Sequence, residues 1–263
     1  MVTLLKIGGN VLDSPQTLSF VLNAFAAFRE PALLVHGGGK IASELMRKMG
    51  IEPVMVDGRR ITDSATLDVV TMVYGGLINK QLVATLQAKG CNAIGLTGAD
   101  ANLIPAQKRA VGAVDYGFVG DLIPSRIDAG RLKLLLDAGL TPVLAPLTHD
   151  EAGSMLNTNA DTIASSVAVA LSRLCEVRLV YCFEKNGVLR NPTDDSSVIP
   201  EIDEALFAEL KASGAVSAGM IPKLDNAFQA LSAGVREVVI CGPDAFRSVN
   251  PVQGTVIRKS GSV

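Results

Sequence analysis

Two glycine-rich turns near the N-terminus each follow a short apolar run and carry a lysine. They are KIGGN at Lys6–Asn10 and HGGGK at His36–Lys40. A glycine turn at the carboxyl end of a parallel strand leaves backbone N–H groups free to approach an anion, and lysine adds positive charge. Each turn alone is equally consistent with a tight strand-to-helix connection and a surface lysine. Their occurrence on two neighbouring strands favours an anion-binding site.

Paired arginines follow an Asp57-Gly58 turn in the segment GRRIT. Exposed arginine pairs are commonly only solvated, but one that turns inward binds a carboxylate through two parallel hydrogen bonds. Successive side chains of a strand point to opposite faces, which makes Arg60 the better candidate for the inward position beside an outward Arg59.

Two later segments add a carboxylate and a third cationic group. In MLNTNAD, at Met155–Asp161, either Asn159 or Asp161 is a candidate helix cap, yet the segment holds more amide and carboxylate groups than one cap requires. In AGMIPK, Pro222 suits the first turn of a helix, so Lys223 lies near a helix N-terminus, although a solvated lysine is the alternative. Lysines, glycine turns, a carboxylate and an arginine at one sheet edge suit phosphoryl transfer, which depends on positioning and charge neutralisation.

A nicotinamide-binding site is the competing interpretation. Gly37, Gly39 and Ala42 satisfy the loose G-x-G-x-x-A pattern, and Asp57 follows at a suitable distance. However, Asp57 falls in a predicted hairpin turn rather than at a strand end, and this interpretation leaves Lys6 unexplained. The P-loop consensus is absent from the sequence.

Composition limits the possible partners. The 263 residues include 24 Lys and Arg against 26 Asp and Glu, a net charge of −2 that argues against nucleic acid. The four cysteines show no CxxC spacing and the two histidines lie far apart, so neither a zinc site nor a disulfide framework is predicted. The N-terminus has no signal-peptide pattern and no uncharged apolar run is long enough to span a bilayer. We therefore expect a soluble cytoplasmic protein with no membrane contact.

Apolar runs alternate with helical spacing along the chain, as in parallel βαβ units. We predict two hairpins, at 51–62 and 108–122, and helices at 15–28, 125–138 and 222–233. A change in character near residue 175 predicts a two-lobe α/β domain. The predicted strands are Thr3–Ile7, Ala32–Val35, Asn92–Leu96, Thr141–Ala145, Val177–Cys182 and Glu237–Cys241.

Together, KIGGN, HGGGK, GRRIT, MLNTNAD and AGMIPK resemble, in this order, the motifs of the amino acid kinase family. The combination is most similar to members that phosphorylate an N-acylated glutamate in arginine biosynthesis. The resemblance implies a three-layer αβα sandwich with an open, mainly parallel sheet. It also implies that an N-lobe, 1–175, binds the acylated amino acid and dimerises, and that a C-lobe, 176–263, binds ATP. Magnesium would be held mainly by nucleotide phosphates and water, with no dedicated protein metal site.

The same resemblance implies roles for individual residues. Lys6 and Lys223 would stabilise the transition state, and Asp161 would organise both ammonium groups. Arg60 would bind the substrate α-carboxylate, and Asn157 would help to hold the acylated amino acid. Backbone groups would contribute at further positions: Gly8 and Gly9 toward phosphate, Gly38 and Gly39 toward substrate, and Gly187 and Gly219, with Lys223, toward the nucleotide.

Two segments depart from the family pattern. The turn after the predicted strand at Val177 reads CFEKNG at Cys182–Gly187, where relatives usually carry a Ser/Thr-Asp-Val-x-Gly turn. The stretch Thr97–Ala101 has an alanine where relatives commonly have a second glycine.

Only Met1 and Val2 precede the first predicted strand, whereas arginine-inhibited relatives carry an extra N-terminal helix. We therefore expect a homodimer that is insensitive to arginine.

The resemblance leaves three alternatives open. The first is N-succinyl-L-glutamate rather than N-acetyl-L-glutamate as substrate, because the motifs do not report the size of the acyl pocket. The second is another family member that acts on aspartate, carbamate, free glutamate or a phosphorylated acceptor. The third is a nucleotide-sensing module without turnover.

Overall fold

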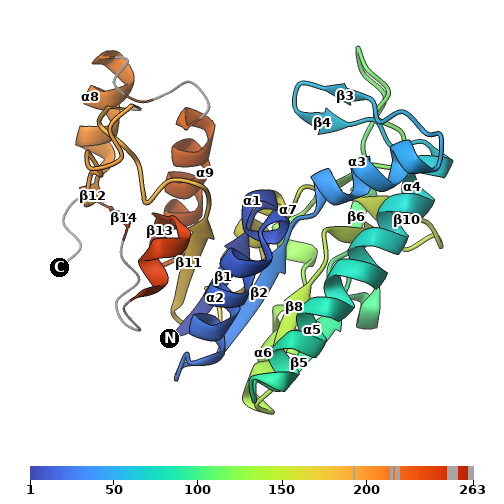
Figure 1. Ribbon diagram of the computed structural model, residues 1–263, viewed down its shortest axis with the longest axis horizontal. Coiled ribbons are helices and arrows are strands. Elements are labelled where there is room, and N and C mark those ends of the chain that lie inside the picture. The colour runs from blue at the N-terminus through green and yellow to red at the C-terminus, as the bar shows by residue number, and fades with distance from the viewer. Residues whose placement is uncertain (192, 214–215, 217–219, 248–253, 260–263) are drawn as a thin grey trace.

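The computed structural model describes the chain except residues 192, 214–215, 217–219, 248–253 and 260–263. Within the described residues, eight strands form one sheet in the order β12-β14-β13-β11-β1-β2-β8-β5 (Figure 1). Every neighbouring pair is parallel except β13 with β14, so the predicted mainly parallel sheet is confirmed. The bounds are Val2–Ile7 for β1, Ala32–His36 for β2, Ala93–Leu96 for β5, Thr141–Leu144 for β8, Val177–Cys182 for β11, Glu201–Ile202 for β12, Glu237–Cys241 for β13 and Thr255–Ile257 for β14.

Helices cover both faces of this sheet and complete the predicted three layers. One face packs against helices α6 to α9, which are Ala129–Asp137, Ala160–Leu171, Glu204–Ser213 and Ile221–Ser232. The other packs against helices α1 to α5, which are Gly9–Asp13, Pro15–Ala26, Gly39–Lys48, Ser64–Val70 and Asn79–Ala88. Strands buried on both faces explain the nearly continuous apolar runs of the sequence.

Local sequence accounts for most helix boundaries. Ser14 caps α2 as predicted, accepting a hydrogen bond from the Thr17 amide. Gly139 and Gly234 follow α6 and α9 with φ of 75° and 110°, conformations that favour glycine. The predicted start of α6 at Ser125 is wrong. Asp128 accepts from the Arg131 amide and starts the helix at Ala129, after a short 3-10 turn at Pro124–Arg126.

The two predicted hairpins project from the sheet and meet each other. Strands β3 (Met55–Val56) and β4 (Arg59–Arg60) pair across the Asp57-Gly58 turn, and β6 (Ala106–Lys108) pairs with β7 (Gly120–Leu122). The Phe118 amide donates to the Thr62 carbonyl at 2.7 Å and joins the two hairpins. A further pair, β9 (Leu147–His149) with β10 (Met155–Asn157), precedes α7.

One helical stretch, Ser64–Ala88, is long and apolar enough by length and composition to cross a membrane. It consists of α4, a π-helical segment η1 at Thr71–Ile78, and α5. Its inner side chains, among them Val69 and Val73, are buried in the core beneath the sheet. Met72 and Leu77 lie on its outer side and are 51% and 46% exposed.

Candidate active site

Lys6 and Asp161 form an ion pair at the carboxyl end of the central strand β1. The Lys6 Nζ lies 2.5 Å from the Asp161 Oδ1, and Lys6 is 6% exposed. Asp161 belongs to the first turn of α7, where Asn159 is the cap and accepts from the Thr162 amide at 3.0 Å. Because Asn159 does the capping, the Asp161 carboxylate remains available to Lys6.

Lys223 approaches the same place from the first turn of α9. Its Nζ lies 3.6 Å from the centre of the Phe183 ring, and the Lys6 Nζ lies 5.0 Å from that centre. Burial lowers the pKa of Lys223; the Asp161 carboxylate opposes this and the Lys6 ammonium adds to it. The three residues predicted to be catalytic therefore converge on one location.

The two glycine turns lie side by side next to these charges. A Cβ atom on Gly37 would lie 3.9 Å from the Gly9 amide nitrogen, so the backbones are in contact range. The Gly8 amide donates to the Cys182 carbonyl at 3.3 Å, whereas the Gly9 and Gly39 amides have no acceptor among the described residues. Gly38 has a φ of 146°, and a Cβ there would lie 2.4 Å from Ile78. Only glycine fits that position.

Arg60 is buried next to the second glycine turn, while Arg59 is exposed, as the strand alternation predicts. The Arg60 Nη2 donates to the Gly39 carbonyl at 2.8 Å and to the Ser43 hydroxyl at 2.7 Å. No carboxylate of the described residues forms an ion pair with Arg60, although it is only 8% exposed. A buried guanidinium without a counter-charge suits an incoming carboxylate.

Asn157 connects the MLNTNAD segment to the GRRIT segment. Its amide nitrogen donates to the Thr62 hydroxyl at 3.0 Å, and that hydroxyl donates to the Arg60 carbonyl at 3.1 Å. Segments almost a hundred residues apart in sequence therefore form one cluster around Arg60.

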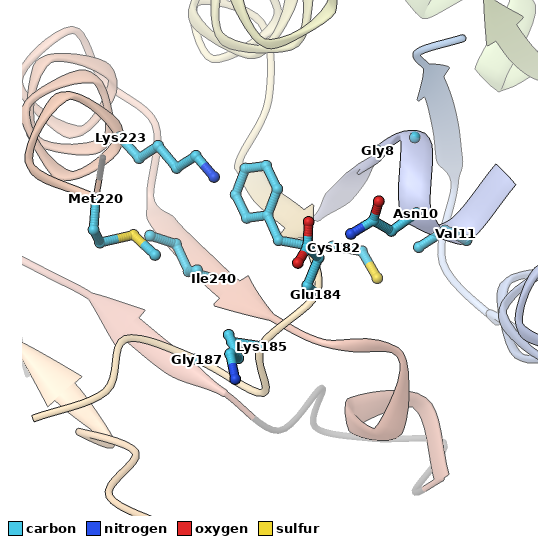
Figure 2. A pocket seen from close by; sticks show the side chains of 12 residues that line it. Gly8, Asn10, Val11, Cys182, Glu184, Lys185, Gly187, Met220, Lys223 and Ile240 are labelled. Carbon is cyan, nitrogen blue, oxygen red and sulfur yellow. The ribbon is translucent and has the colours of Figure 1, made fainter. Parts of the chain in front are cut away.

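A pocket of about 340 Å³ opens between the β1 turn and α9. Figure 2 shows Lys223 extending across it from α9, opposite Gly8 and Asn10. Gly187 lines the pocket wall, where a Cβ would lie 2.7 Å from both the Thr255 hydroxyl and Val198. Gly219, the other predicted nucleotide contact in this region, lies outside the described residues.

Sequence reasoning missed several residues that shape the site. Phe183 attracted attention only as a departure from the family pattern. Tyr74 carried no signal, yet burial raises its pKa, and the Arg60 guanidinium opposes that shift. His36 is fully buried, which lowers its pKa to about 4. Its Nδ1 contacts the Gly37 carbonyl at 2.7 Å and its Nε2 contacts the Asn79 amide at 3.3 Å, so it braces the HGGGK turn.

The donor groups near the pocket do not form a protein metal centre. Within the part of the chain that the structure describes, no three His, Cys, Asp or Glu side chains gather to hold an ion. One carboxylate, that of Glu184, lines the pocket, and the Asp161 carboxylate beside the pocket is paired with Lys6. This donor set fits a cation that arrives with phosphate oxygens as its main ligands.

Comparison with known proteins gives consistent results. The acetylglutamate kinases of Bacteroides thetaiotaomicron and Phocaeicola vulgatus are 55% and 56% identical over 258 residues, which is 98% of this chain and of each relative. The crystal structure of smu.665 from Streptococcus mutans is 28% identical, with a TM-score of 0.75 and 98% of both chains covered.

An N-acetylglutamate synthase from Neisseria gonorrhoeae shares the fold, with a TM-score of 0.81 at 22% identity. This chain spans 60% of the length of that synthase, and the match covers 99% of this chain. The model of the amino acid kinase family matches residues 1–242. The chain belongs to the amino acid kinase family.

Proposed function

We propose that the protein transfers the γ-phosphoryl group of ATP to the γ-carboxylate of N-acetyl-L-glutamate, giving ADP and N-acetyl-L-glutamyl 5-phosphate for arginine biosynthesis. The observation that carries the proposal is the convergence of Lys6, Asp161 and Lys223 beside two glycine turns. The two relatives that are more than half identical, and that bear the name acetylglutamate kinase, support the choice of substrate.

The reaction needs charge neutralisation more than acid-base chemistry. The substrate carboxylate is already ionised at neutral pH, so one of its oxygens attacks the γ-phosphorus without a general base. The new C–O–P bond forms as the bond to the β-phosphate oxygen breaks, and the electron pair leaves on ADP. Lys6 and Lys223 offset the negative charge on either side, and Asp161 orients Lys6.

Arg60 and Asn157 bind the acylated glutamate in this proposal. The buried Arg60 guanidinium binds the α-carboxylate as its missing counter-charge, while Asn157 and the backbone amides of Gly38 and Gly39, which have no acceptor among the described residues, hold the remaining polar atoms. The N-lobe, 1–175, therefore binds the substrate that accepts the phosphoryl group.

The C-lobe, 176–263, contributes the nucleotide side of the site. The pocket lined by Gly8, Gly9, Gly187 and Lys223 receives the phosphates of MgATP, and Gly219 belongs to the same proposed set. Magnesium enters with the nucleotide and takes most of its oxygen ligands from the phosphates, since no three ligating side chains of the described residues gather there.

The outer side of Ser64–Ala88 supports a homodimer. Met72 and Leu77 expose apolar surface on one helical stretch whose inner side is already in the core, and a second copy would cover them. Four free cysteines are consistent with a reducing, cytoplasmic environment. If the protein sediments as a monomer in analytical ultracentrifugation at micromolar concentration, the proposed dimer is contradicted.

ADP release with MgATP tests the function, using N-acetyl-L-glutamate, N-succinyl-L-glutamate and free L-glutamate in parallel. Hydroxylamine captures the acyl phosphate as a hydroxamate and distinguishes transfer from ATP hydrolysis. We expect turnover with the acetylated substrate. Turnover with the succinylated substrate alone would change the acyl group but keep the chemistry, whereas no hydroxamate with any of the three would overturn the proposal.

A further inference from the structure

Lys223 has no carboxylate partner of its own among the described residues. Lys6 holds the Asp161 carboxylate at 2.5 Å, whereas no described residue forms an ion pair with Lys223. Two ammonium groups thus share one neighbourhood in which the Asp161 carboxylate is already engaged, and Glu184 raises the pKa of Lys223 only through its charge, without an ion pair. Like charges repel, and a long lysine side chain loses rotamer freedom when it is fixed. Some other feature must therefore hold Lys223 in place.

The ring of Phe183 provides that feature. The Lys223 Nζ lies 3.6 Å above the ring centre and the Lys6 Nζ lies 5.0 Å from it, both within the range of cation–π attraction. The face of an aromatic ring is electronegative but offers no hydrogen-bond acceptor oxygen and no titratable group. It therefore attracts both ammonium groups without using their N–H donors, so those of Lys223 stay free for phosphate oxygens. A carboxylate in its place would occupy those donors and cancel the positive charge.

The ring is itself fixed by its neighbours. Phe183 directly follows β11, and its amide donates to the Cys241 carbonyl at 2.8 Å. Its ring stacks on Tyr181 with centres 5.7 Å apart and an angle of 7° between the planes. The Tyr181 hydroxyl donates to the Asp161 carbonyl at 3.4 Å. One aromatic pair thus connects the end of β11 to the start of α7, where Asp161, the ion-pair partner of Lys6, is located.

We propose that Phe183 is a positioning residue, whose ring face holds the Lys223 ammonium, together with that of Lys6, on the path of the transferring phosphoryl group. The inference rests on the proposed kinase function and adds a residue to it. Its role is indirect, because it acts through the two lysines and contributes no atom to the bonds that form or break.

Stepwise fluorination of Phe183 tests the electrostatic part of this proposal. Replacement by mono-, di- and trifluorophenylalanine weakens the electronegative ring face while nearly preserving the ring volume. We expect kcat to fall progressively, by about fivefold at trifluorophenylalanine, with KM for N-acetyl-L-glutamate unchanged. A purely structural ring would show no such progression, and a flat or rising kcat would overturn the proposal.

Phe207 is the matched control. It also carries a lysine above its ring, with the Lys211 Nζ 5.6 Å from the centre, and it also stacks on another aromatic ring, that of Phe228. It does not line the pocket. Fluorination of Phe207 should leave kcat unchanged, and an equal fall at both positions would mean that fluorination acts through stability and would overturn the proposal.

A second measurement does not depend on turnover. Protons above an aromatic ring resonate upfield, so the Lys223 ε-CH₂ signal of lysine-labelled protein should lie upfield of the other lysines, be absent in Lys223→Ala, and return to the ordinary position in Phe183→Leu. An unshifted Lys223 signal in the folded wild-type protein would overturn the inference. If wild type forms no hydroxamate, the proposed function fails, but this shift still reports whether Phe183 holds Lys223.

Discussion

Replacement of Arg60 by methionine tests the substrate side of the site most directly. Arg60 is 8% exposed, and its guanidinium donates to the Gly39 carbonyl, the Ser43 hydroxyl and the Met46 sulfur, without a carboxylate partner among the described residues. Methionine has a similar length and fills the space without charge. We expect Arg60→Met to raise KM for N-acetyl-L-glutamate strongly while kcat stays within about threefold, because the α-carboxylate is bound equally in ground and transition states.

The magnitude follows from the burial of the pair. Truncating one partner of a buried, hydrogen-bonded charge pair costs about 2–5 kcal/mol. A value of about 3 kcal/mol corresponds to about a 150-fold rise in KM. In the ligand-free protein, the substitution loses three hydrogen bonds, two to oxygen atoms of about 1 kcal/mol each and a weaker one to the Met46 sulfur, but relieves an uncompensated buried charge that costs several kcal/mol. The free energy of unfolding should therefore be unchanged or higher in Arg60→Met.

Steady-state kinetics from ADP release measures the change in KM. Thermal unfolding with and without N-acetyl-L-glutamate measures the change in stability. Wild type should gain thermal stability with the ligand, and Arg60→Met should lose that gain at the same concentration. Arg60→Lys, which keeps the charge but not the planar fork, should have an intermediate KM. A fall in kcat at unchanged KM, or a loss of more than about 5 °C in ligand-free Tm, would refute the reasoning.

Three further predictions concern other parts of the molecule. Lys6→Ala and Lys223→Ala should each lower kcat by about 100-fold or more with little change in KM for N-acetyl-L-glutamate, and the opposite pattern would mean misassigned roles. Ala101 has a φ of 52°, so Ala101→Gly should raise the free energy of unfolding in urea by about 0.5–1 kcal/mol, whereas Ala138→Gly, at a φ of −77°, should lower it. The pKa of His36 falls from 6.5 to about 4 on folding, so the unfolded chain binds a proton that the fold excludes. Stability present above about pH 6.5 should be lost toward pH 4, by about 2 kcal/mol at pH 5, and a similar loss in His36→Gln would refute this assignment.

The central strands and the glycine turns could be predicted from sequence because each strand is a short apolar run, and most of these runs end at or near a glycine or proline. Thr255–Ile257 and Glu201–Ile202 could not, because two or three residues at a sheet edge carry no periodicity. The start of α6 was misplaced because Ser125 and Asp128 are both acceptable caps, and only burial of Ile127 favours the second.

The charged part of the site was also accessible from sequence, since its residues lie in motifs whose joint order resembles the amino acid kinase family. The aromatic part of the site could not be predicted, because it depends on tertiary packing. Phe183 and Tyr74 are ordinary aromatic residues in sequence, and their significance arises from packing against Lys223 and Arg60. The roles assigned to the site residues stay predictions until the variants are measured.

The order of the sheet also affects how the chain can be synthesised and divided. Strand β1 lies between β2 and β11, and Val2 pairs with Val177, so one side of β1 stays uncovered until most of the chain has emerged. All six residues of β1 are buried in the finished fold. During synthesis this strand is an apolar, unpaired edge, the type of edge that promotes association between chains. A break near residue 175 would leave that edge permanently open, so we expect residues 1–175 and 176–263 to fold as one cooperative unit.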